Sequence, residues 1–124
     1  METLLSPRYG LVVLDATILE REPLVGAEGW EGVVFRFLPQ SPYRPWGLEE
    51  LARGLRSQLE PRGWVPRCQT LNTLPLFGGP QYTMRAARGG EGMGLFLRPL
   101  EPPDTYRLEV GPADPNPPLT CPPR

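Results

Sequence analysis

Histidine and lysine are both absent from this 124-residue chain, so its 13 basic residues are all arginine. Without histidine there is no imidazole to act as a general base near neutral pH, to activate a serine or cysteine, or to bind a metal. Without lysine there is no Schiff-base amine and no P-loop lysine. Most of the common catalytic groups are therefore missing, and we lean towards a protein that is not an enzyme.

Cysteine is scarce, since the chain has only Cys68 and Cys121. Such sparse use fits a reducing cytoplasm. We expect Cys68 to be a small buried apolar residue, because no histidine is present to activate its thiol. A disulfide between the two cysteines stays open as the less favoured alternative.

Long apolar runs and an excess of positive charge are also lacking. The longest apolar stretch, residues 11–19, is interrupted by Asp15, and the first residues do not have the pattern of a signal peptide. The formal net charge is −1, whereas nucleic-acid-binding domains are usually basic. We therefore expect a cytoplasmic protein without a membrane span, for which nucleic acid is a disfavoured partner.

Proline and glycine are abundant, at 18 and 14 residues. Half of the prolines lie in residues 99–124, where each lacks an N–H and biases its predecessor towards extended geometry. The apolar content of 40% is ordinary and is enough for one core. We predict a single α+β domain over residues 1–110 and a flexible, proline-rich tail over residues 111–124.

One amphipathic helix is predicted over residues 47–60. Its apolar stripe at helical spacing consists of Leu48, Leu51, Ala52, Leu55 and Leu59. Glu49 and Glu50 suit the positive end of the helix dipole, and Gly63 can close the helix in a left-handed conformation. Gly54 weakens the middle by roughly 1 kcal/mol relative to alanine unless something packs closely there.

Strand patterns fill most of the remaining chain. Apolar or alternating runs occupy residues 9–19, 33–38, 64–71 and 105–110, and a glycine-centred hairpin is predicted from residues 81–87 and 93–98. Most connections are too short for parallel crossovers, and one helix cannot cover both faces of a parallel sheet. The sequence therefore predicts an α+β fold, with a mostly antiparallel sheet of about five or six strands and the helix on one face.

Aromatic and arginine side chains gather before the predicted helix. Tyr43, Arg44 and Trp46 lie on a proline-rich segment, and these residue types are enriched at binding hot spots. Our leading hypothesis is a non-catalytic interaction domain, acting as a subunit, adaptor or assembly factor, that binds another protein or a second copy of itself here. For the two tryptophans themselves we favour a structural interpretation, in which Trp46 and Trp64 bracket the helix ends and close the core.

Three arginines of the predicted hairpin, Arg85, Arg88 and Arg98, form a second candidate binding set. An exposed basic edge would contact an acidic partner or discourage edge pairing. The same residues support a third hypothesis, a weak contact with nucleic acid.

Carboxylates are the acid–base groups that remain. Asp15 interrupts an apolar run, so it faces solvent, marks a bulge, or is buried with a raised pKa. The last case would fit a small ligand-binding domain or a carboxylate-dependent enzyme that uses Asp15 or Glu31 with Arg36 in a pocket lined by the sheet. No glycine-rich segment opens a helix, and the acidic residues lack the spacing of a calcium loop, so we expect neither a cofactor nor a metal.

Overall fold

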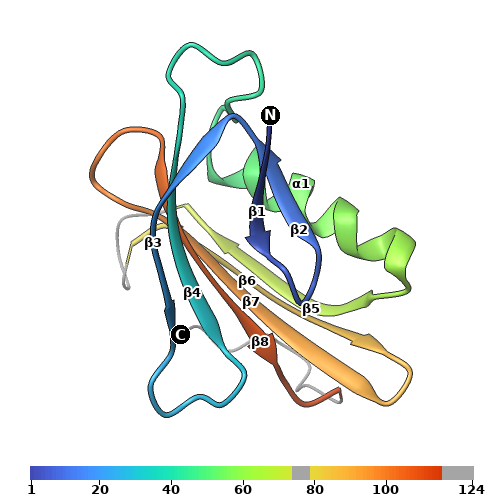
Figure 1. Ribbon diagram of the computed structural model, residues 1–124. Helices are drawn as coiled ribbons and strands as arrows, with labels where there is room; N and C mark the ends of the chain where they lie inside the picture. The colour runs from blue at the N-terminus through green and yellow to red at the C-terminus, as the bar shows by residue number, and fades with distance from the viewer. Residues whose placement is uncertain (74–78, 116–124) are drawn as a thin grey trace.

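A computed structural model describes residues 1–73 and 79–115 (Figure 1). Its elements are β1 (Glu2–Ser6), β2 (Leu11–Leu14), β3 (Ala16–Pro23), β4 (Glu31–Phe37), α1 (Leu48–Leu59), the 3₁₀ turn η1 (Glu60–Arg62), β5 (Val65–Asn72), β6 (Gln81–Arg88), β7 (Glu91–Pro99) and β8 (Thr105–Pro112). β3 to β8 form an antiparallel six-stranded sheet in the order β3-β4-β8-β7-β6-β5, and β1 pairs with β2 in a separate hairpin. The predicted α+β fold, with one helix and a mostly antiparallel sheet, is confirmed.

The predicted strand over residues 9–19 is in fact two strands that belong to different sheets. Asp15 separates β2 from β3 with a φ of 54°, a left-handed conformation that aspartate tolerates better than most residues. This turn sends β3 to the edge of the large sheet and leaves β2 in the hairpin. β1, which pairs with β2, has no counterpart among the predicted strands.

The predicted helix is confirmed at Leu48–Leu59, and all five members of its apolar stripe are buried. Gly63 closes the helical segment with a φ of 90°, and the backbone N–H of Trp64 donates to the carbonyl of Leu59 at 3.2 Å. The chain therefore leaves the helix directly into the core, where Trp64 is buried.

One face of the large sheet is covered by the β1–β2 hairpin and α1 together (Figure 1). Alternate residues of each central strand point to this side, for example Val33, Phe35 and Phe37 on β4, and they are buried against the hairpin and the helix. The guanidinium of Arg21 donates to the carbonyls of Leu4 and Leu5 at 2.7 and 2.8 Å, which ties the hairpin to β3.

Part of the second face of the sheet is packed by Trp30. The indole of Trp30 lies on Gly94 and Gly111, where a Cβ would collide with the ring, and its N–H donates to the carbonyl of Pro112 at 2.8 Å. Glycine is therefore required at both positions by the close approach of the ring. Arg107 lies nearby and forms ion pairs at 3.0 and 3.1 Å with Glu22 and Glu109.

Two expectations about the end of the chain meet the structure only in part. β8 continues through Gly111 and Pro112, two residues beyond the predicted domain boundary, and the rest of the predicted tail from residue 116 onward lies outside the described residues. Cys68 is buried as expected, but it is disulfide-bonded and not a free thiol. Cys121 lies outside the described residues, and the disulfide removes the support that sparse cysteine gave to a reducing compartment.

Across residues 1–73 and 79–115, α1 is the longest helix, and no helix there is long and apolar enough to cross a membrane.

Candidate functional site

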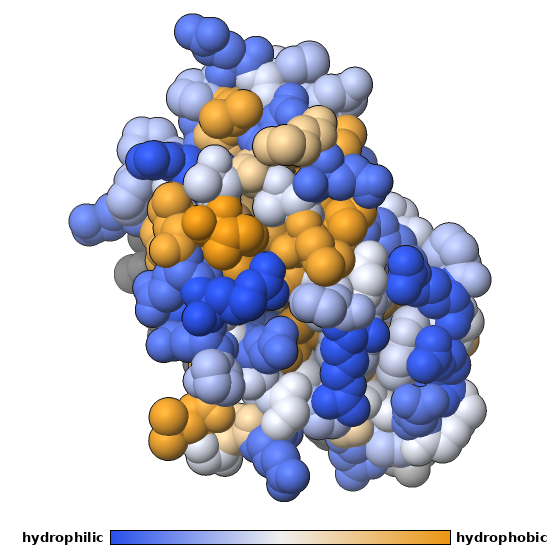
Figure 2. Space-filling model, viewed as in Figure 1, coloured by the Kyte–Doolittle hydropathy of each residue, from blue (hydrophilic) through white to orange (hydrophobic). Residues whose placement is uncertain are grey.

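An apolar groove lies between β2 and α1. Its volume is about 460 Å³, within the range of about 300–1,000 Å³ that is typical of ligand sites. The groove is lined by Glu2, Val12, Val13, Leu14, Phe37, Tyr43, Pro45, Glu50, Leu51, Gly54, Leu55 and Gln58. Figure 2 shows apolar residues gathered on this side of the molecule, over the hairpin and the adjoining part of the helix.

The β2 wall of the groove presents backbone groups as well as side chains. The N–H of Asp15 donates to the carbonyl of Met1 at 2.9 Å, so the next pair in the ladder, Leu14 with Glu2, is a non-hydrogen-bonded pair. The N–H and C=O of Leu14 therefore point away from β1, towards the helix. Within residues 1–73 and 79–115, neither group has a hydrogen-bond partner.

Two residues nearer the hairpin turn, the same edge of β2 is already occupied. The side-chain amide of Gln58 accepts a hydrogen bond from the N–H of Val12 and donates one to its C=O, each at 2.8 Å. One residue of α1 thus closes the groove at this end by pairing with the strand edge.

The helix wall has a gap at Gly54. A Cβ built on Gly54 has no other atom within 4 Å, whereas Leu51 and Leu55 on either side are buried in the core. The glycine therefore widens the groove where the edge of β2 is unpaired.

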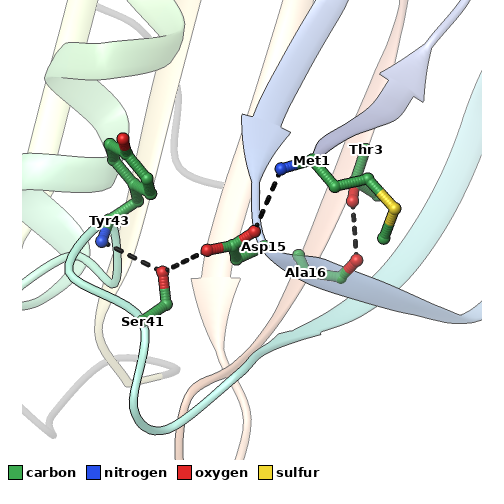
Figure 3. Close-up of polar contacts among 6 residues, drawn as sticks. All are labelled: Met1, Thr3, Asp15, Ala16, Ser41 and Tyr43. Atoms are coloured by element: carbon green, nitrogen blue, oxygen red, sulfur yellow. Dashed lines mark hydrogen bonds and ion pairs between the residues drawn. The ribbon is translucent and has the colours of Figure 1, made fainter.

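A network centred on Asp15 holds the rim of the groove (Figure 3). The Asp15 carbonyl accepts from the N–H of Leu38 at 2.9 Å, and its carboxylate accepts from the Ser41 hydroxyl at 2.8 Å. The Ser41 oxygen in turn accepts from the N–H of Tyr43 at 3.0 Å, and the Met1 ammonium lies 3.2 Å from the other Asp15 oxygen. These bonds fix the segment that carries Tyr43 beside the groove.

The environment of Asp15 is opposite to the buried case considered from the sequence. The hydrogen bond from Ser41, and next the one from the N-terminal amine, lower the pKa of its carboxyl from the ordinary value of 3.8. Asp15 is therefore ionised at neutral pH. Its observed role is to hold the Ser41 segment against the hairpin.

Trp46 and Tyr43 project from this segment into solvent. Trp46 is 96% exposed and Tyr43 is 59% exposed, so the prediction that Trp46 helps to close the core is wrong, although Trp64 does so at 4%. The backbone of Trp46 is nevertheless fixed, because its N–H donates to Glu50 at 2.7 Å. Arg44 forms an ion pair with Asp104 at 3.3 Å and so anchors the segment to the β7–β8 connection.

The three hairpin arginines are spread along β6 and β7. Arg88 lies at the turn, 4.5 Å from the centroid of the Trp64 ring and 3.6 Å from Glu91. Arg85 pairs with Gly94 in the middle of the hairpin, and Arg98 lies four residues further along β7. Since β6 and β7 are interior strands of the sheet, these side chains do not form a basic edge.

Asp15, Glu31 and Arg36 do not form one site. Ala16 pairs with Phe37, and Pro23 pairs with Glu31. Asp15 therefore lies at the opposite end of the ladder from Glu31, about 20 Å away at the usual rise per residue. Arg36 lies near the Asp15 end but is exposed on the second sheet face, where it pairs with Thr17.

The pKa shifts of Asp15 and of three partly buried tyrosines do not favour acid–base work at neutral pH. The pKa of Asp15 is lowered, and burial raises the pKa values of Tyr9, Tyr82 and Tyr106 above 10.0. Each shift takes the group further from neutrality. In the described part of the chain, no three acidic or cysteine side chains gather as metal ligands would.

Sequence reasoning missed the groove because its two walls are distant in the chain. The available signal was Gly54, a glycine in the middle of a strongly amphipathic helix. A second signal was Asp15, whose charge marks the point where one apolar run becomes two strands.

Comparison with known proteins assigns the chain to no group. No protein-family model matches the chain, and no curated protein or solved structure matches it significantly.

Proposed function

We propose that this protein is a non-catalytic interaction domain that binds a partner protein through the β2–α1 groove and the aromatic rim beside it. The observation that carries the proposal is Trp46, an almost fully exposed tryptophan on a backbone held by Glu50. Groove and rim together form one apolar surface, because Tyr43 and Pro45 line the groove and Trp46 follows them.

The rim has the physical properties of a binding anchor. A large aromatic side chain gains most from burial at an interface, and tryptophan and tyrosine are enriched at hot spots. Binding requires little ordering of this backbone, because the Asp15–Ser41–Tyr43 hydrogen bonds hold it already. An apolar surface of this kind on a small domain is typical of an interaction site.

The alternative functions have less support. A carboxylate-dependent enzyme would use Asp15 or Glu31 with Arg36 in one pocket, but Arg36 is exposed on the second sheet face and Glu31 lies at the opposite end of the strand pair from Asp15. Contact with nucleic acid would need a basic stripe, and Arg85, Arg88 and Arg98 do not form one. A small apolar ligand would fit the volume of the groove, but it would leave Trp46 without a role.

Affinity capture from lysate of the native host tests the proposal. The immobilised protein should retain a specific partner, and the Tyr43→Ala/Trp46→Ala double variant should lose at least nine tenths of it. Val25→Ala is the control, because Val25 is fully exposed in the β3–β4 connection, far along the chain from the rim. The melting temperatures of all three proteins should agree within a few degrees, because exposed side chains contribute little to stability.

Retention of the same partner by the double variant would contradict the proposal. So would loss of the partner with the control variant alone, because that would place the binding surface at the β3–β4 connection.

A further inference from the structure

The unpaired edge of β2 is a template for another strand. In the described residues no strand pairs with this edge, and the N–H and C=O of Leu14 point into the groove. Two residues earlier on the same edge, at Val12, the backbone groups already have a partner. The side-chain amide of Gln58 forms hydrogen bonds with both the N–H and the C=O of Val12. A residue of an antiparallel strand makes the same pair of bonds. The position opposite Leu14 is therefore ready for a peptide group.

The groove around this edge favours extended chain. Most of its lining residues are apolar, and the gap at Gly54 leaves room for a side chain between the strand and the helix. Since alternate side chains of a strand point to opposite sides, a segment added to β2 would place every second side chain towards Leu51, Gly54 and Leu55. Apolar side chains at those alternate positions would fill the groove and exclude water from the new hydrogen bonds.

Charge defines the remaining chemistry of the occupant. Glu2 and Glu50 both line the groove, and none of the described lining residues is an arginine. Two carboxylates with no basic side chain between them attract a cationic group and repel an acidic one. Arginine or lysine at the outward positions of the segment would pair with them.

We propose that the partner supplies an extended segment that adds to the edge of β2 at Leu14, with alternate apolar side chains in the groove and arginine or lysine facing Glu2 and Glu50. This inference rests on the proposed function and specifies how the partner is held. Addition of a strand to a sheet edge is an established mode of peptide recognition, in which the backbone supplies affinity and alternate side chains supply specificity. Proline is excluded opposite Leu14, because it has no N–H to donate.

A phage-displayed library of random 12-residue peptides is the probe. We expect selection on the immobilised protein to enrich peptides in which apolar residues alternate with arginine or lysine. The enriched peptides, made synthetically, should lose at least tenfold in affinity when the backbone nitrogen that bonds Leu14 is methylated. Methylation of the neighbouring residue, whose N–H points away, is the matched control.

Variants at Gly54 separate binding from folding. Gly54→Leu fills the groove without a clash at Cβ and replaces a poor helix former with a good one. It should weaken peptide binding at least tenfold with no fall in melting temperature. Gly54→Ala, which adds only a methyl group, is the control for the helix effect and should retain most of the affinity.

Three results would overturn this inference. The first is enrichment of peptides that are rich in proline or whose apolar residues recur at helical spacing. The second is a peptide affinity that does not change when the backbone nitrogen is methylated. The third is unchanged peptide binding by Gly54→Leu. If the Tyr43→Ala/Trp46→Ala variant still loses the lysate partner in any of these cases, the proposed function stands and only the strand-addition mode fails. A dimer in light scattering that Gly54→Leu converts to a monomer would identify the occupant as a second copy of this chain and would also overturn it.

Discussion

The two tryptophans that flank α1 lie in opposite environments. Trp64, after the helix, is 4% exposed, packs edge-to-face on Tyr9 at 5.9 Å between ring centroids, and is covered by the guanidinium of Arg88. Trp46, before the helix, is 96% exposed. Both have fixed backbones, so the difference does not arise from disorder. One end of the helix is built into the core, and the other presents an aromatic side chain to solvent.

The interface between α1 and β2 shows the same asymmetry along its length. Near the C-terminal end of the helix, Gln58 pairs with Val12 and closes the interface. Nearer the N-terminal end, Gly54 leaves a gap in the wall of the groove that Leu14 also lines. The comparison shows that one helix–strand contact can be hydrogen-bonded and closed at one end and open at the other, and it is the open end that we propose as the binding site. Substitutions at the two ends should therefore have separable effects.

The largest expected effect is the loss of Trp64. Trp64→Ala should lower the free energy of unfolding by about 3–5 kcal/mol, because it removes a large buried side chain and leaves a cavity. Trp46→Ala should change it by no more than about 0.5 kcal/mol, because the side chain is already in water. Urea unfolding followed by circular dichroism measures both.

If Trp64→Ala does not fold, Trp64→Phe provides the comparison, with a smaller loss of the same sign. Equal losses in the free energy of unfolding for Trp64→Ala and Trp46→Ala would contradict the proposed difference between the two ends of the helix.

The second effect concerns the hydrogen bonds that close the groove. Gln58→Ala should lower the free energy of unfolding by about 1–2 kcal/mol, since two hydrogen bonds to the Val12 backbone are lost at a partly buried site. Ser57→Ala is the neighbouring control, because the Ser57 hydroxyl bonds only the Gly54 carbonyl of its own helix. Amide hydrogen exchange at Val12 should accelerate in the Gln58 variant alone. Unchanged exchange there would show that Gln58 does not hold the edge of β2.

The third effect has the opposite sign. Gly54→Ala should raise the free energy of unfolding by about 0.5–1 kcal/mol, because alanine loses less conformational entropy in a helix and its methyl group meets no other atom. Thermal and urea unfolding both measure this gain. A loss of stability would mean that the gap at Gly54 is filled in solution. The interface between α1 and β2 would then be closed at both ends, which would contradict the comparison.

The fold could be predicted to different depths in different regions. The four leucines and one alanine of the α1 stripe recur at helical spacing, and all five are buried. Such a pattern lies within one element, so it can be predicted without knowledge of the neighbouring elements. The division of residues 9–19 could not be predicted from periodicity. It depends on the backbone of a single residue, Asp15, whose left-handed φ only the structure shows.

The site was predicted only in part for the same reason. Tyr43 and Trp46 could be singled out by residue type, but their exposure depends on whether the helix end packs into the core, and the sequence allowed both answers for Trp46. The groove itself depends on the distance between β2 and α1 and on the pairing register that leaves Leu14 free. Both are properties of tertiary structure and not of any local pattern.

The smallest effect is a dependence on pH at the rim. Because the hydrogen bond from Ser41 lowers the pKa of Asp15, the ionised form of Asp15 stabilises the folded protein. This contribution is fully present above the ordinary value of 3.8, which applies to the unfolded chain, and it is lost as the pH falls through the lower pKa of the folded state. The stability difference between the wild type and Asp15→Asn should therefore be constant near neutral pH and should shrink below about pH 4. Urea unfolding across pH 2–7 measures it, and Ser41→Ala should show a weaker pH dependence than the wild type. If the stability difference between the wild type and Asp15→Asn were the same at all pH values, the charge of Asp15 would not hold the rim. The position of Tyr43 beside the groove would then depend only on the uncharged contacts of its segment.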